Sequence, residues 1–211
     1  MGNSKLRRDG SRAQFILGSG SPRREDLLKA AGYTFTREPP RTRELIVPGE
    51  EPIVAAVRLA IEKALDVLGR SSLGSVVLAA DTIVVCGRRI YGKPRDTAHA
   101  ADMLMSLAGR NHDVITGWAI LQRHETTGSL QSIVASCRSV VRMREVPQRE
   151  ARLYAAGGEP LDKAGGYAVQ GEGKRFIGAI LGPVDNVIGL PVCHVVRGLG
   201  RFGIHLRDPI T

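Results

Sequence analysis

Val76-Val77-Leu78-Ala79-Ala80-Asp81-Thr82-Ile83-Val84-Val85-Cys86 is an apolar run that a single polar pair interrupts. Such a run predicts a buried β-strand, or two strands separated at Asp81-Thr82. A carboxylate with so many apolar neighbours is expected to be partly buried, and burying an unpaired charge is costly. Asp81 therefore needs a lysine, a metal ion or a proton beside it; the plainer alternative is a structural aspartate held by backbone N–H groups.

The segments on both sides of this run alternate between strand and helix patterns. Ser21-Pro22 and Asp96-Thr97 are helix-start signals, and Gly32 and Gly109 are stop signals. A mixed α/β sheet with flanking helices follows from this order. The expected strands are 14–19, 33–37, 76–86, 114–123 and 133–142, the expected helices are 21–32, 51–68, 96–108 and 148–156, and glycine-rich turns with short strands are expected from there to the end.

The composition is that of a globular protein, with 43% hydrophobic and 24% charged residues, which excludes whole-chain disorder, collagen and coiled coil. The formal net charge of +9 suggests anionic partners, either phosphates or nucleic acid. Aromatic residues make up only 4%, which is sparse for a platform that stacks bases. We therefore expect no specific nucleic-acid partner.

The cysteines Cys86, Cys137 and Cys193 are far apart and form no CxxC pair, so neither disulfides nor a zinc ribbon is expected.

The N-terminus has no apolar signal region, and no run approaches the roughly 18 apolar residues of a membrane span. These features predict a cytoplasmic protein with no membrane partner. No repeat or long linker appears, so residues 1–12 are interpreted as a flexible basic tail and 13–211 as one catalytic domain.

Gly18-Ser19-Gly20-Ser21-Pro22-Arg23-Arg24 is a Gly/Ser turn between an expected strand and an expected helix. Arg23 and Arg24 fall in the first helical turn, where the helix dipole makes cations unfavourable and a bound anion favourable. Unpaired N–H groups, serine hydroxyls and two guanidinium groups at one point suit a polyphosphate. The alternative is a solvated arginine pair after an ordinary helix cap.

Two lysines are ambiguous from their own surroundings. Lys63 lies about 140° from the expected core face of helix 51–68, which favours solvent, although Ala56 and Leu59 share its stripe and that stripe could line a cleft. Lys93 follows Gly92 and precedes Pro94 in a rigid turn. The expected core face of helix 51–68 is Ile53, Val54, Val57, Ile61, Ala64, Leu65 and Leu68.

Residues 158–171 combine many glycines with acidic, basic and amide groups, including Lys163 and Gln170, and are typical of a loop at a functional site. The five histidines show no metal-binding spacing and are interpreted as structural or surface residues.

Together these segments resemble the Maf-like family of nucleoside triphosphate pyrophosphatases, in family order from about residue 14 to 195. The resemblance implies a mixed α/β sheet with two lobes around a cleft, related to inosine triphosphate pyrophosphatases, and often a homodimer. The matching pieces are SGSPRREDLL, RLAIEKA, LAADTIVV, GKPRDTAHAADMLMSLAGRNHDVITG, GEPLDKAGGYAVQG and NVIGLP.

The resemblance also implies roles for particular residues. Asp81 would be the proton acceptor and Glu44 a second acid, the two holding Mg²⁺ or Mn²⁺. Many family members have Asp-Glu where this chain has Arg43-Glu44, so the metal site here is expected to be weaker or differently composed. Neutralisation of the triphosphate is implied for Arg23, Arg24, Lys63 and Lys93, base preference for Arg23, Thr82 and Gln170, and further substrate contacts for Ser19, Ser21 and Lys163.

The activity that this resemblance implies is hydrolysis of dTTP and UTP, and of modified pyrimidine nucleotides, to the monophosphate and pyrophosphate, which would clear unwanted nucleotides from the pool. The competing class is a non-enzymatic regulator of septum formation that acts by binding a partner or nucleic acid.

Overall fold

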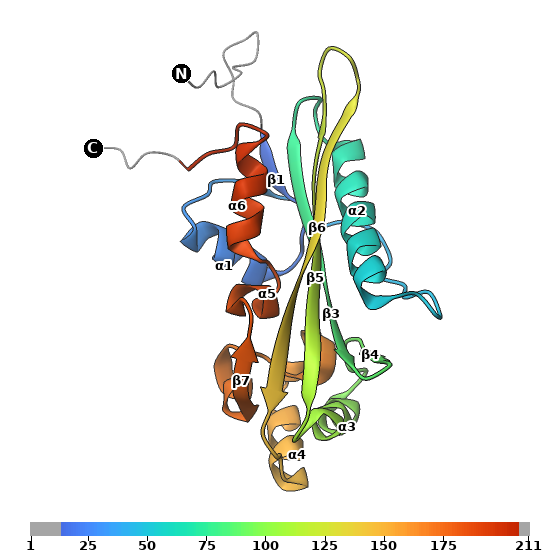
Figure 1. The fold of residues 1–211 in the computed structure, drawn as a ribbon, viewed down its shortest axis with the longest axis vertical. Coiled ribbons are helices and arrows are strands. Elements are labelled where there is room, and N and C mark those ends of the chain that lie inside the picture. The colour runs from blue at the N-terminus through green and yellow to red at the C-terminus, as the bar shows by residue number, and fades with distance from the viewer. Residues whose placement is uncertain (1–13, 207–211) are drawn as a thin grey trace, which may run out of the picture. The chain divides into compact units, whose positions relative to one another are not determined.

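The computed structural model describes residues 14–206; the predicted basic tail, 1–12, lies outside them. A seven-stranded sheet has the strand order β2-β1-β3-β5-β6-β7, with β4 paired to β3. Parallel pairs (β1 with β2 and β3) and antiparallel pairs (β3 with β4, β6 with β7) make it a mixed sheet. Helices flank it, so the predicted α/β class is confirmed (Figure 1).

The strands are β1 (Phe15–Leu17), β2 (Thr36–Arg37), β3 (Val76–Cys86), β4 (Arg89–Tyr91), β5 (Asn111–Arg123), β6 (Leu130–Met143) and β7 (Ile177–Leu181). The α-helices are α1 (Pro22–Ala30), α2 (Pro52–Arg70), α3 (Thr97–Leu107), α4 (Gln148–Ala156), α5 (Val184–Ile188) and α6 (Val192–Gly200), and the 3-10 helices are η1 (Glu159–Asp162), η2 (Ala164–Gly166) and η3 (Gly171–Phe176). Within the described residues, no helix is both long and apolar enough to cross a bilayer.

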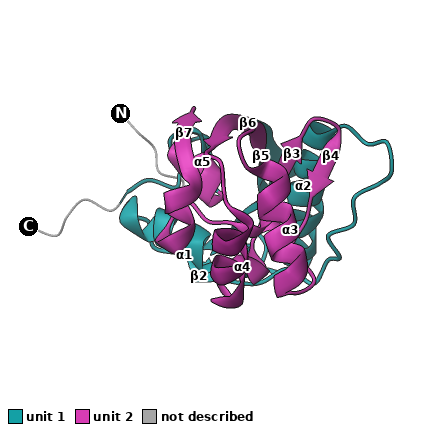
Figure 2. Cartoon of the chain, turned by 90° about the horizontal axis from the view of Figure 1, so that it is seen from below, with its two compact units in different colours: residues 1–81, 117–136, 190–211 teal, residues 82–116, 137–189 magenta. Residues whose placement is uncertain are grey.

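The described residues divide into two compact units (Figure 2). Unit 1 holds residues 14–81, 117–136 and 190–206, and unit 2 holds 82–116 and 137–189. Three strands, β3, β5 and β6, pass from one unit into the other, and in β3 the division falls between Asp81 and Thr82.

In unit 1 the alternation of β3 builds two separate cores, because successive side chains of a strand face opposite sides of the sheet. Val76, Leu78 and Ala80 pack in a cluster with residues of α1 and α6. Val77 and Ala79 pack in a cluster with residues of α2. Asp81 continues this second series and therefore faces α2.

The expected core face of α2 is wrong in part. Ala64 and Leu68 are buried, but Ile53, Val54 and Leu65 are 48%, 56% and 42% exposed. The buried stripe consists mainly of small side chains and includes Lys63. Its members are Ala55, Ala56, Leu59, Ala60, Lys63, Ala64, Val67 and Leu68.

A glycine explains why the small side chains face inward. A Cβ on Gly117 of β5 would collide with the backbone of Ala56 and Val57. At so close an approach only small side chains fit between the helix and the sheet, so steric fit outweighs the larger apolar area of the other face. The most hydrophobic face of α2 is consequently left outside.

Unit 2 has a core of its own, in which Val84 and Cys86 of β3 pack with Leu104 and Leu107 of α3 and with Phe176. The helix predicted at 148–156 is confirmed as α4. The prediction of only turns and short strands after it is wrong for α5 and α6. Val192, Val195, Val196 and Leu199 recur at helical spacing, and this signal was available in the sequence.

A buried histidine makes the stability of the fold depend on pH. His112 is 3% exposed, and its Nε2 lies 2.6 Å from the Tyr167 hydroxyl. Burial lowers the pKa of His112 to about 4, although Asp113 acts in the opposite direction. Between about pH 6.5 and pH 4, His112 is therefore protonated in the unfolded chain but not in the folded chain.

We expect the free energy of unfolding to fall by up to about 3 kcal/mol through this one group between about pH 6.5 and pH 4. Urea unfolding at several pH values across that range measures the slope. The His112→Gln variant should lose this part of the pH dependence, and an unchanged slope in the variant would contradict the assignment.

Candidate active site

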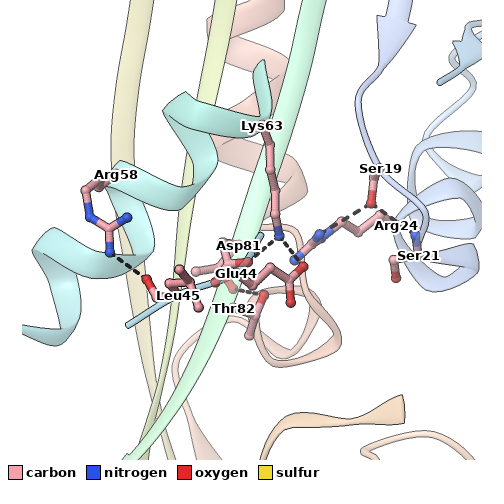
Figure 3. Close-up of polar contacts among 10 residues, drawn as sticks. Ser19, Ser21, Arg24, Glu44, Leu45, Arg58, Lys63, Asp81 and Thr82 are labelled. Atoms are coloured by element: carbon pink, nitrogen blue, oxygen red, sulfur yellow. Dashed lines mark hydrogen bonds and ion pairs between the residues drawn. The ribbon is translucent and has the colours of Figure 1, made fainter. Parts of the chain in front are cut away.

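A buried lysine between two carboxylates forms the centre of the site in unit 1 (Figure 3). Lys63 of α2 has a side chain that is only 5% exposed, and its Nζ donates to Asp81 Oδ1 of β3. The same Nζ donates to Glu44 Oε1 at 2.6 Å. Asp81 is 10% exposed and Glu44 47% exposed, so the two carboxylates differ strongly in their contact with water. The lysine satisfies the need for a partner that the sequence predicted at Asp81.

The loop that carries Glu44 is bound to α2 by Arg58. Arg58 Nη2 donates to the carbonyl oxygen of Leu45 at 2.9 Å (Figure 3). The same nitrogen donates to Glu50 Oε2 at 2.7 Å. Arg58 Nη1 also donates to Glu62 Oε1 at 2.8 Å. These bonds place Glu44 beside Lys63 although 19 positions separate the two residues in the sequence.

The turn between β1 and α1 follows the sequence prediction closely. Ser21 is the N-cap of α1 and Pro22 begins the helix. The backbone N–H of Gly18 donates to Leu78 O at 2.7 Å, which binds the turn to β3. The buried Ser19 hydroxyl accepts from Ser21 N at 3.1 Å and from Arg24 Nη1 at 3.3 Å.

Arg24 is partly buried in this turn. Burial lowers the pKa of its guanidinium from the ordinary value, and the charge of Arg23 acts in the same direction. The charges of Asp81 and Glu44 raise it, which also shows that the two carboxylates and the arginine act on one another. The arginines of the turn and the lysine of α2 therefore belong to one charged cluster.

Arg37 is a part of this turn that sequence reasoning missed. Its Nε donates to Ser19 O at 3.2 Å and its Nη2 to Gly20 O at 2.7 Å. Its Nη1 also binds Glu25 of α1 at 3.1 Å. Arg37 reaches the turn because β2 pairs in parallel with β1, in the register Leu17 with Arg37. No local pattern in the sequence gives that register.

The remaining predicted residues, Thr82, Lys93, Lys163 and Gln170, belong to unit 2. Lys93 is exposed at the turn before α3, and Gln170 is exposed at the start of η3. Lys163 is partly buried, and its Nζ donates to Glu159 O at 2.5 Å and to Asp162 Oδ1 at 2.6 Å. The structure unites the unit 1 residues in one cluster, and the joint action of the unit 2 residues with them stays a prediction.

A carboxylate holds the loop around Gln170 in place. Glu159 Oε2 accepts from Glu172 N at 3.0 Å, and its Oε1 accepts from Gly173 N at 3.1 Å and from the Tyr154 hydroxyl at 2.9 Å. Burial raises the pKa of Glu159, but these hydrogen bonds outweigh it, and the pKa is lowered. Glu159 therefore stays ionised at neutral pH and connects η1 to η3.

The oxygen ligands of the cluster fit a hard divalent cation. Mg²⁺ is commonly held by one or two carboxylates together with substrate phosphates and water, and Asp81 and Glu44 offer two carboxylates. Across residues 14–206 no group of three or more His, Cys, Asp or Glu side chains is arranged to hold a metal by itself. Arg43 is exposed beside Glu44 and adds no oxygen ligand.

We expect Lys63→Met to destabilise the protein by about 3 kcal/mol, because it leaves Asp81 buried without its cation. The double variant Lys63→Met/Asp81→Asn should recover part of this loss, since it also removes the uncompensated charge. Arg138→Met, which removes the exposed cation of the Arg138–Asp113 pair, should cost less than about 1 kcal/mol. Chemical denaturation measures all three, and a Lys63→Met variant as stable as the parent would disprove the account.

The family model described as Maf-like protein matches residues 14–202. Three curated relatives, each named dTTP/UTP pyrophosphatase, show identities above 40%. That of Syntrophotalea carbinolica is 46% identical over 89% of this chain and 84% of its own length. That of Anaeromyxobacter dehalogenans is 41% identical over 92% of this chain and 96% of its own length. That of Geobacter sulfurreducens is 42% identical over 91% of this chain and 98% of its own length.

Among solved structures, a nucleoside-triphosphatase / dITP/XTP pyrophosphatase of Mycobacterium abscessus covers 89% of this chain and 97% of its own, at 16% identity and a TM-score of 0.43. The family match spans both units and contains every residue of the charged cluster. The chain therefore belongs to the Maf-like protein family.

Proposed function

We propose that this protein is a nucleoside triphosphate pyrophosphatase that hydrolyses the α–β phosphoanhydride of dTTP and UTP. The products would be the nucleoside monophosphate and pyrophosphate, and the role would be to remove unwanted nucleotides before polymerases use them. The observation that carries the proposal is the buried Lys63 held between Asp81 and Glu44. The names of the relatives support the reaction and the two substrates.

The first requirement of the reaction is to offset the charge of the triphosphate. The N-terminus of α1 offers backbone N–H groups, and Arg23 and Arg24 lie in its first turn. Arg37 donates to the carbonyl groups of Ser19 and Gly20 and so fixes the turn that precedes the helix. An anion at this turn would relieve the unfavourable placement of two arginines at a positive helix end.

The second requirement is a base for the attacking water. Asp81 is the better candidate of the two carboxylates, because it is buried on a rigid strand while Glu44 lies on an exposed loop. Lys63 donates to the Asp81 carboxylate and fixes its orientation. Asp81 and Glu44 are also the residues that would hold Mg²⁺ or Mn²⁺, and such a cation would supply further neutralisation of phosphate charge.

Base preference is assigned to Gln170, with Thr82 and Arg23. A side-chain amide offers a donor and an acceptor together, which matches the adjacent carbonyl and N–H groups of uracil or thymine. Gln170 is exposed on the segment that Glu159 holds in place, so its backbone is fixed while its amide stays accessible. Lys93 and Lys163 are proposed as further contacts to the substrate from the same unit.

The expected result for the parent protein is release of pyrophosphate from a panel of triphosphates with Mg²⁺ or Mn²⁺, with dTTP and UTP highest in kcat/KM. Asp81→Asn should lower kcat by about 10² to 10⁴ and leave nucleotide binding within about tenfold, because it removes proton acceptance but keeps the shape. Asp102→Asn, on the exposed side of α3, is the matched control. A near-normal kcat for Asp81→Asn would exclude Asp81 as the base.

The alternative of a non-enzymatic regulator of septum formation is not favoured, because the curated relatives carry enzyme names.

A cytoplasmic location is part of the proposal, since nucleotide pools and their polymerases are found there.

We further infer a homodimer through the outer face of α2. Ile53, Val54, Val57 and Ile61 line an open apolar hollow together with Arg58 and Glu62. Leu45, Ile46, Val47 and Leu65 are also exposed, and apolar side chains are enriched in the core of homodimer interfaces. Arg58 and Glu62 add one charge of each sign, which allows the face to pair with a second copy of itself.

The parent chain is therefore expected to sediment as a dimer, and Val54→Asp as a monomer with unchanged thermal stability, since Val54 is 56% exposed. Leu153→Asp on α4, where Leu153 is 63% exposed, is the matched control and should stay dimeric. A monomeric parent, or a dimeric Val54→Asp, would contradict this interface.

A further inference from the structure

A chain of buried hydrogen bonds in unit 2 ends at Thr82, the residue that follows Asp81. Thr82 Oγ1 lies 3.0 Å from Thr116 Oγ1 of β5, the neighbouring strand. Thr116 Oγ1 donates to the carbonyl oxygen of Asn186 on α5 at 2.9 Å. Thr116 and Asn186 are both 0% exposed, so no water competes for these bonds.

The donor and the acceptor of each hydrogen bond in this series follow from the backbone carbonyl group at its end. A carbonyl oxygen only accepts, so the single hydrogen of the Thr116 hydroxyl is committed to Asn186 O. The bond between the two threonines must then be donated by Thr82. Its hydroxyl hydrogen is consequently used inside the protein, and its oxygen can only accept from a ligand.

The second half of the network fixes Asn186 in the same manner. Its Nδ2 donates to Val114 O at 3.0 Å and to Ser139 Oγ at 3.0 Å. The Ser139 hydroxyl donates to Pro183 O at 2.9 Å, so it accepts from the amide. Asn186 therefore holds α5 against β5 and β6, and with α5 it holds the carbonyl that orients Thr116.

We propose that Thr116 and Asn186 are positioning residues that make Thr82 a hydrogen-bond acceptor for the substrate base. An acceptor cannot bind a phosphate oxygen or a base carbonyl, because those groups only accept. On dTTP and UTP the remaining donors are the N3–H group and the sugar hydroxyls. Of these, only N3–H distinguishes uracil and thymine from cytosine, whose N3 carries a lone pair. This inference rests on the proposed function and concerns the choice of base.

Thr82 then accepts from N3–H in place of the amide oxygen of Gln170, and the amide nitrogen of Gln170 donates to one of the two carbonyl groups that flank N3. With CTP the Thr82 oxygen would face the lone pair of N3, leaving both acceptors without a hydrogen. Leaving such a group unpaired in a buried site lowers binding by about 5- to 150-fold.

The test compares kcat/KM for UTP and CTP in the parent and in three variants. Thr116→Val removes the acceptor for the Thr82 hydrogen, so Thr82 can turn and donate, and the UTP-to-CTP ratio should fall by about tenfold. Thr116→Ser keeps the hydroxyl and should restore the ratio. Ser106→Ala removes a hydroxyl of unit 2 that bonds instead to the Tyr91 hydroxyl and the Met103 carbonyl, and it should leave the ratio unchanged.

The outcomes separate the inference from the function on which it rests. A parent that releases pyrophosphate from no triphosphate overturns both. An active parent whose UTP-to-CTP ratio survives Thr116→Val, or falls equally in Ser106→Ala, overturns the inference alone. If Thr116→Val does not fold, Thr82→Val decides: the inference requires it to lower kcat/KM for UTP by about tenfold and to leave that for CTP within about twofold.

Discussion

The ammonium group of Lys63, buried beside Asp81, is the constraint on which the rest of unit 1 depends. A lysine can lie on the inner side of a helix only if carboxylates accompany it, and only if the helix approaches the sheet closely enough for the charges to meet. Gly117 permits the approach, Asp81 and Glu44 supply the carboxylates, and the small residues of α2 fill the interface. The same closeness leaves Ile53, Val54 and Leu65 of α2 outside.

The alternation of β3 divides chemistry between the two sides of one strand. Asp81 lies on the same face of β3 as Val77 and Ala79. Thr82 lies on the opposite face, with Val84 and Cys86. Two adjacent residues therefore enter different environments: one meets a buried cation, and the other a network of neutral hydrogen bonds. On the proposed roles of Asp81 and Thr82, proton acceptance and base recognition would be tuned by separate sets of neighbours.

Local sequence signals were sufficient where the structure depends on near neighbours. The apolar run of β3, the Ser21-Pro22 start of α1 and the bounds of α4 followed from periodicity and capping. The need of Asp81 for a partner also followed, but the partner itself did not. Periodicity places Lys63 toward solvent, because it locates the most apolar face of a helix. The face that packs on the sheet is instead the one with the smallest side chains, and it includes Lys63.

Residues that act across strand pairings left no local signal. Arg37 reaches Ser19 only through the register of β1 with β2, and Thr116 meets Asn186 across 70 positions of sequence. Family resemblance supplied the proposed roles of Glu44 and Gln170: no local pattern singled out Glu44, and composition marked Gln170 only as part of a candidate site loop.

The division of the chain into segments has a consequence for its synthesis. Unit 1 draws on residues at both ends of the described chain, since Val195 and Leu199 of α6 complete the cluster that begins at Phe15. Unit 2 lies wholly between residues 82 and 189. On the ribosome, where the chain emerges from the N-terminus onward, Phe15 and Leu17 of β1 must wait for α6, the last described helix, before their cluster is complete. The apolar core of unit 2 can therefore close before this cluster of unit 1 does.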